Sequence, residues 1–158
     1  MPKKPIISLP HYNQKRSASC LSACVVMVLA HWQVTVDEAD IRRLLKTKPF
    51  LGTHAINLVR LSELGFSAWP MEGTVAELRQ WVGKRVPVIV FLWTGVLSHL
   101  EDLGEVDYLH AIVVVSWTDT TVWVHDPLLP DGPTEIPWGE FIEAWSYARQ
   151  MMAVIEPR

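Results

Sequence analysis

The chain has 158 residues, 49% of them apolar and 20% charged, and its net charge is −3. This length suits a single domain over residues 1–158 with a sizeable core. The charge balance lacks the basic surplus that nucleic-acid binding requires, so nucleic acid is not an expected partner. No apolar run reaches the roughly 20 residues that span a bilayer, and the N-terminus lacks the apolar segment of a signal peptide. We therefore expect a soluble, cytoplasmic protein without a membrane span and with reduced thiols.

Helical patterns dominate the first half of the chain. A short edge strand is expected at residues 6–9. The run from Cys20 to Trp32 is apolar on nearly every side, which is typical of a helix buried on most faces. Three further helices are predicted at 37–46, 54–64 and 75–82, each beginning near a capping Asp or Thr, with a short strand at 66–69.

Strand patterns dominate the second half. Residues 86–93 and 111–117 are continuous apolar runs rich in β-branched side chains, and 121–125 is expected to return antiparallel to the second of them through a turn at 118–120. A proline-rich loop at 128–137, a helix at 138–145 and a strand at 151–155 follow. This order predicts an α+β fold in which a central N-terminal helix packs against an antiparallel sheet.

Cys20 lies where a polar loop meets the first long helix. The positive end of the helix dipole and the unpaired backbone N–H groups there favour a thiolate over a thiol. A cysteine in this position could equally be a small core residue. Cys24, one helical turn further on, is expected to be buried and inert, although it is an alternative nucleophile.

A nucleophilic cysteine needs a base, a group that orients the base, and donors for the developing oxyanion. His110 stands before strand 111–117, and Asp126 follows the partner strand. A simple register leaves these two offset by a few residues, so we expect a bulge or a twist to bring them together. Gln14, six residues before Cys20, could donate its side-chain amide to an oxyanion. In isolation, His110 could be a hydrogen-bonded residue at a strand end and Asp126 the start of an Asx-turn.

Several short segments resemble the C39-like family of papain-like cysteine peptidases over about residues 6–155. They are Gln14 with Cys20 and Cys24, Gly52-Thr53, Pro87-Val-Ile-Val, His110-Ala-Ile-Val-Val-Val, His125-Asp126-Pro127 and Trp138-Gly-Glu-Phe141. The family often has Asp-Cys-Gly around the nucleophile, whereas this chain has Ser19-Cys20-Leu21.

The resemblance implies a papain-like α+β fold and a cysteine peptidase without cofactor or metal. In that reading Cys20 is the nucleophile, His110 the general base and acid, Asp126 the orienting residue and Gln14 the side chain of the oxyanion hole. The substrate would be a peptide or protein cleaved after small residues such as Gly-Gly. The best-known members are peptidase domains of ABC exporters, and this chain resembles a free-standing relative.

Three alternatives remain open. A C39-like module could bind a peptide without cutting it, or the same thioester could pass its acyl group to an amine or a thiol. A metal site built from Cys20, Cys24 and His110 would lack the usual CxxC or HxxxH pair. The other five histidines have no partner that spacing identifies.

The segment 94–107 carries Glu101, Asp102, Glu105 and Asp107 shortly before His110. We expect a surface loop here, and a sharper hypothesis is that it overhangs the cleft and favours basic peptide substrates.

Overall fold

The computed structural model describes residues 4–49, 52–104 and 108–158. Its centre is a six-stranded sheet with the order β1-β6-β2-β3-β4-β5, in which every neighbouring pair is antiparallel. The strands are β1 (Phe66–Glu72), β2 (Val88–Trp93), β3 (Leu109–Trp117), β4 (Thr121–His125), β5 (Thr134–Pro137) and β6 (Met151–Pro157). The predicted α+β class with an antiparallel sheet is confirmed.

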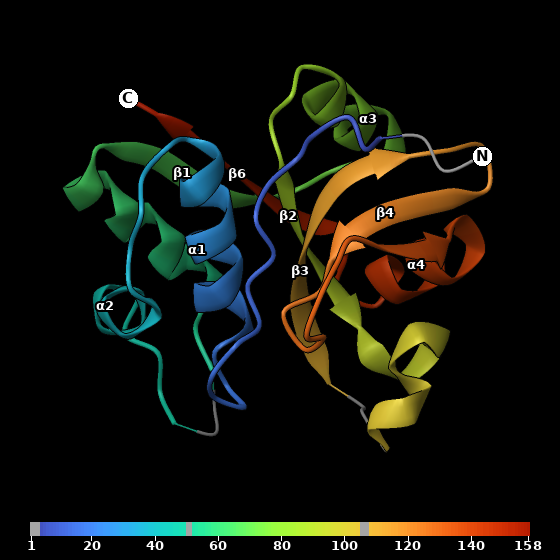
Figure 1. Cartoon of the computed structure of the whole chain (residues 1–158), viewed down its shortest axis with the longest axis horizontal. Helices are drawn as coiled ribbons and strands as arrows, with labels where there is room; N and C mark the ends of the chain where they lie inside the picture. Colours follow the sequence, from blue (N-terminus) through green and yellow to red (C-terminus); the bar gives the residue numbers. More distant parts are fainter. Residues whose placement is uncertain (1–3, 50–51, 105–107) are drawn as a thin grey trace.

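Helices lie on both flanks of this sheet (Figure 1). They are α1 (Cys20–His31), α2 (Glu38–Leu44), α3 (Val75–Gly83) and α4 (Trp138–Ser146), with 3-10 helices η1 (Ala55–Leu64), η2 (Thr94–Val96) and η3 (Ser98–Leu103). In Figure 1, α1 and α2 lie on one side of β2 and β3, whereas α4 lies on the other. Among the described residues, no helix combines the length and the apolar character that crossing a membrane would need.

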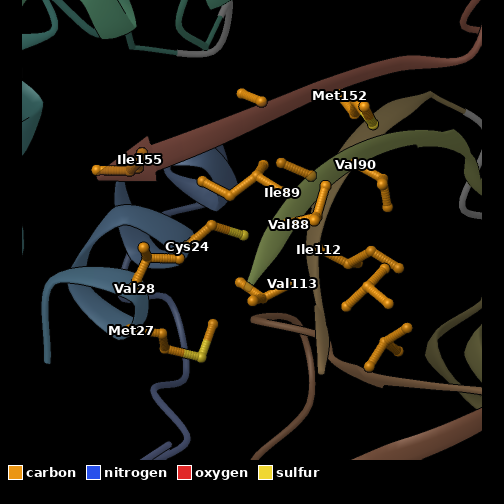
Figure 2. Close-up of a cluster of buried hydrophobic side chains, with 14 of the residues drawn as sticks. Cys24, Met27, Val28, Val88, Ile89, Val90, Ile112, Val113, Met152 and Ile155 are labelled. Carbon is orange, nitrogen blue, oxygen red and sulfur yellow. The ribbon is translucent and has the colours of Figure 1, made fainter. Parts of the chain in front are cut away.

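The central position of α1 follows from its composition. Its apolar residues cover most of its circumference, and eight of its residues are buried. The helix packs directly against β3. Figure 2 shows Cys24 and Val28 of α1 facing apolar side chains of the sheet, among them Ile89. The N-terminal end of α1, which starts at Cys20, is therefore held against the sheet by the core.

Three predicted elements differ from the structure. Residues 6–9 form no strand, although Ile7 N donates to Val115 O at 3.0 Å on β3. The helix at 54–64 is a 3-10 helix, and its buried residues Leu58 and Leu61 are three apart, which matches the repeat of that helix. Part of the expected loop 128–137 is β5, an edge strand that ends at Pro137, where a proline is tolerated.

Candidate active site

Cys20 is the first residue of α1 and is partly exposed. The loop before it is tied to α2 through the buried carboxylate of Glu38, which accepts from Lys15 N at 3.1 Å and from Ser19 Oγ at 3.3 Å. Leu21, in the place where the family often has glycine, is only 3% exposed and belongs to the core. Its side chain therefore packs inside the protein.

A β-bulge brings His110 and Asp126 to one face of the sheet. Near the turn Trp117 pairs with Val122, but beyond a register shift between Val114 and Ser116 it is Val113 that pairs with His125. If this register continues by one residue, Asp126 lies opposite the β3 residue two positions from His110. Side chains two positions apart on a strand point to the same face of the sheet, so Asp126 and His110 share a face. Without the shift, Asp126 would lie on the opposite face of the sheet from His110. The expected bulge is therefore present, and it places the two residues on one face.

The Asp126 carboxylate is fully buried and binds two imidazoles. His110 Nε2 lies 2.6 Å from Oδ1, and His99 Nε2 lies 2.7 Å from Oδ2. Burial raises the pKa of Asp126, but His110 and His99 outweigh burial and hold that pKa well below its usual value. The carboxylate is therefore ionised and can only accept, so both Nε2 atoms donate. Leu128 N also donates to Oδ1 at 2.9 Å, which is the Asx-turn predicted as the simpler role of Asp126.

The thiol of Cys20 and the imidazole of His110 change one another's ionisation. Burial alone would raise the pKa of Cys20, but the interaction with His110 and the backbone of Ala111 lowers it below its ordinary value. Burial alone would lower the pKa of His110, but Asp126 and then Cys20 raise it to about 10. His110 Nδ1 is buried and has no hydrogen-bond partner among the described residues. The imidazolium therefore presents a spare N–H at the ring position not used by Asp126.

Cys24 has the opposite surroundings. It is fully buried, and burial raises its pKa well above the ordinary value of a thiol. Figure 2 shows its side chain among apolar residues of α1 and the sheet. The environment of Cys24 is that of an inert core thiol.

Gln14 lies near Asp126, because Gln14 N donates to Pro127 O at 2.8 Å and Asn13 Nδ2 donates to the same oxygen at 2.7 Å. Its side-chain amide, however, is turned toward its own loop. Gln14 Nε2 donates to Arg16 O at 2.7 Å and to Ser17 O at 3.2 Å, while Oε1 is buried and unpaired within the described residues. Both amide hydrogens are engaged, so the structure does not hold Gln14 as a free oxyanion donor.

Sequence spacing identifies no partner for His99, whereas the structure gives it Asp126. Thr94 N and Thr94 Oγ1 donate to Tyr108 O, each at 3.0 Å, which closes the loop that carries His99 back onto the start of β3. Ser98 is fixed to α4, because its backbone N–H donates to Glu140 Oε1 at 2.8 Å. The signal in the sequence that could have found His99 is the loop that carries it, because this loop leaves one predicted strand and returns to the next beside His110. Of the four acids expected in this segment, Glu101 and Asp102 are exposed on η3, whereas Glu105 and Asp107 lie outside the described residues.

Spacing likewise identifies no partner for His11 or His125, but the two contact each other. Their Nδ1 atoms are 2.9 Å apart, and His11 Nε2 is 2.8 Å from Leu129 O. A carbonyl can only accept, so His11 Nε2 donates to it, and in neutral His11 the Nδ1 atom then accepts from His125. Burial, followed by the proximity of His11, lowers the pKa of His125 to about 4. His125, which directly precedes Asp126 in the sequence, is therefore neutral near pH 7.

No group of three or more His, Cys, Asp and Glu side chains is arranged to hold a metal ion within 4–49, 52–104 and 108–158. The site that these ranges do contain is a thiol, two imidazoles and one carboxylate.

Comparisons with known proteins agree on one family. The description "Peptidase C39 family" matches residues 8–158, and no curated protein matches the chain. A protein from Bacillus anthracis described as a C39-like peptidase superposes with a TM-score of 0.78 at 18% identity, covering 99% of each chain. The peptidase domain of Streptococcus ComA, a bifunctional ABC transporter involved in quorum sensing, gives a TM-score of 0.75 at 21% identity, covering 94% of this chain and 98% of that domain.

A third solved structure is a double-glycine-motif protease from an AMS/PCAT transporter, in complex with its leader peptide. It gives a TM-score of 0.71 at 17% identity and covers 96% of this chain and 93% of that one. At these identities the likeness establishes the fold, and the predicted papain-like α+β fold is confirmed. The family description covers nearly the whole chain, and the chain therefore belongs to the peptidase C39 family, a family of cysteine peptidases.

Proposed function

We propose that the protein is a cysteine peptidase in which Cys20, His110 and Asp126 act together. One observation carries the proposal: a buried, ionised carboxylate binds the Nε2 atom of an imidazole, and that imidazole lowers the pKa of a thiol at a helix N-terminus. A thiolate beside an imidazolium is the reactive state of a cysteine nucleophile.

In the proposed reaction the Cys20 thiolate attacks the carbonyl carbon of a peptide bond, and the carbonyl oxygen takes the negative charge. His110 then gives its Nδ1 proton to the leaving amine as the C–N bond breaks, which leaves a thioester on Cys20. A water molecule gives a proton back to His110 and attacks the thioester, which releases the acid and restores the thiolate.

The oxyanion requires hydrogen-bond donors on the side of the approaching carbonyl. We assign one to the backbone N–H of Cys20 and the other to the side chain of Gln14. Gln14 can serve only if its amide rotates and gives up a loop carbonyl, and the 3.2 Å bond to Ser17 O is the longer of its two bonds. Substrate binding would thus exchange a weak internal hydrogen bond for one to the oxyanion.

We assign His99 a positioning role through Asp126. Its Nε2–H occupies Oδ2, which leaves Oδ1 for His110. The carboxylate is held at both oxygens and cannot turn away from the general base.

Support for a peptide substrate cleaved after small residues comes from the double-glycine protease bound to its leader peptide. The test is a set of short fluorogenic peptides whose central pair is Gly-Gly, Ala-Ala or Leu-Leu. We expect cleavage after Gly-Gly, its loss in Cys20→Ala, and little change in His54→Gln, which alters an exposed histidine.

The same experiment separates the alternatives. Binding of the Gly-Gly peptide by wild type with no cleavage would favour a non-catalytic module. Hydroxylamine added as an acceptor would give a hydroxamate from the thioester, and a product that forms only with an added amine or thiol would favour acyl transfer over hydrolysis.

A further inference from the structure

Half of the residues that line a cavity beside the loop preceding Cys20 are cations. Its volume is about 570 Å³, within the range of about 300–1,000 Å³ that ligand sites occupy. Five positively charged side chains line it: Arg16, Arg42, Arg43, Lys46 and Lys48. Among the described residues that line it, none is acidic.

This concentration of charge is local. The chain has 14 Lys and Arg residues against 17 Asp and Glu, so five of its 14 cations line one cavity of a protein with net charge −3. A general basic surface would distribute them. Five like charges around one concave space repel each other, and an anion bound there would relieve that repulsion.

Ion pairs within the protein neutralise only part of the charge. Arg42 pairs with the buried Glu38, and Arg43 pairs with Asp40. Arg16, Lys46 and Lys48 are exposed and form no ion pair within the described part of the chain. Three cations therefore remain available to a ligand.

The cavity adjoins the proposed nucleophile. Ser17 and Ala18 form part of its wall, and two residues of chain span at most about 7 Å between Ala18 and Cys20. Glu38 fixes this arrangement, because it joins Lys15 and Ser19 of the loop to α2, whose residues form the opposite wall. A peptide bound at Cys20 could extend into the cavity with only a few further residues.

We propose that the cavity binds an acidic segment of the peptide substrate, a short distance along the chain from the bond that Cys20 attacks. The inference rests on the proposed function for the identity of the ligand as substrate. The cavity would favour acidic peptides, whereas Glu101 and Asp102 on η3 would favour basic peptides. Figure 1 shows η3, the yellow segment, on the other side of α1 from α2, so the two charged regions lie on different flanks.

The test measures binding separately from cleavage. Dye-labelled peptides with a central Gly-Gly pair and a flank of Glu, Gln or Lys are titrated against Cys20→Ala protein by fluorescence anisotropy, with the flank on either side of the pair. We expect the Glu peptide to bind at least about tenfold more tightly than the Gln peptide at low salt, since several exposed ion pairs contribute, and the ratio to fall as salt is added.

Two triple variants locate the effect. Arg16→Gln, Lys46→Gln and Lys48→Gln together should abolish the preference for the Glu peptide. Lys4→Gln, Lys84→Gln and Arg158→Gln remove the same charge from positions that do not line the cavity, and should retain it.

Equal binding of the Glu and Gln peptides, tighter binding of the Lys peptide, or a preference that survives in the first triple variant would each overturn the proposal. So would a labelled oligonucleotide that binds the cavity more tightly than the Glu peptide. Cleavage of the Gln peptide by wild type is measured in parallel. If cleavage is absent while the Glu preference persists and depends on the cavity, the proposed function fails and the anion site stands.

Discussion

His99 and His110 donate from their Nε2 atoms to different oxygens of one buried carboxylate, at 2.7 Å and 2.6 Å. The two histidines come from different elements, η3 and β3, so Asp126 joins η3 to the sheet. An orienting carboxylate with both oxygens occupied has one orientation, which is the property that a general base requires of it.

Removing the His99 donor should therefore weaken catalysis through Asp126. We expect His99→Ala to lower kcat about tenfold with KM little changed, and His99→Gln, whose amide can reach the same oxygen, to restore most of it. The acid limb of the pH profile of kcat/KM should move to higher pH in His99→Ala, because the pKa of Asp126 is then less depressed. Equal activity of the alanine and glutamine variants would contradict the positioning role, and His54→Ala is the matched control.

Replacing Asp126 itself should have a larger effect. We expect Asp126→Asn to lower kcat by about a hundredfold to ten-thousandfold, because the imidazolium loses the negative charge that stabilises it and an amide can also present its N–H₂ to the ring, which favours the wrong tautomer. Kinetics on the preferred peptide measure this, with circular dichroism to show that the sheet is intact. A loss of less than threefold would remove Asp126 from the proposed mechanism.

The lowered pKa of Cys20 predicts a pH dependence for its alkylation. Thiolate persists below the ordinary pKa of cysteine as long as His110 is protonated, so the rate of reaction with iodoacetamide should be high on the acid side of that pKa. In His110→Ala, the imidazole no longer offsets the rise that burial causes in the pKa of Cys20. The midpoint of the rate profile should therefore move to higher pH. Overlapping profiles for the two proteins would show that His110 does not influence the thiol.

Glu38 should be important for both stability and the loop before Cys20. It is 1% exposed and accepts hydrogen bonds from Lys15, Ser19 and Arg42. We expect Glu38→Ala to reduce the free energy of unfolding by about 2–4 kcal/mol in urea titrations, and Glu38→Gln to reduce it less. Asp40→Ala removes the exposed pair with Arg43 and should cost less than about 1 kcal/mol. Similar losses in the two alanine variants would contradict this difference.

Gly132 packs against the pair of His11 and His125. A Cβ atom at this position would lie 2.7 Å from His11 Nδ1 and 2.9 Å from His125 Nδ1, so Gly132→Ala should displace the pair and cost about 1–3 kcal/mol. Apart from its chain neighbours and its own helix backbone, no atom of the described residues lies within 4 Å of such a Cβ at Gly139 in α4, and Gly139→Ala should be neutral or stabilising by up to about 1 kcal/mol. Thermal unfolding of both variants checks this, and equal melting temperatures would refute it.

The sequence was most informative where one local signal determined the structure. The apolar run after Cys20 predicted α1, and the β-branched runs predicted β2 and β3, because burial on both faces needs continuous apolar sequence. Asp126 and His110 could be named as a pair from the hairpin, but only the register shift near Val115 decides which face Asp126 occupies. A bulge has no reliable signature in a single sequence.

Long-range contacts were the part that spacing could not supply. His99 reaches Asp126 because the loop between Thr94 and Tyr108 is closed by hydrogen bonds. The sequence indicates that this loop returns beside His110, but not that the closure brings His99 to Asp126. The basic cavity likewise combines Arg16 with residues of α2 and the segment after it, which are brought together by the buried Glu38.

Cys20, activated by His110, is the proposed nucleophile. The most direct test treats native protein with a thiol-directed acylating probe and maps the adduct by mass spectrometry in wild type, Cys20→Ala, Cys24→Ala and His110→Ala. We predict a single adduct on Cys20 that persists in Cys24→Ala, disappears in Cys20→Ala and forms slowly in His110→Ala. Labelling that survives Cys20→Ala and vanishes in Cys24→Ala, or no labelling of either thiol, would contradict the claim.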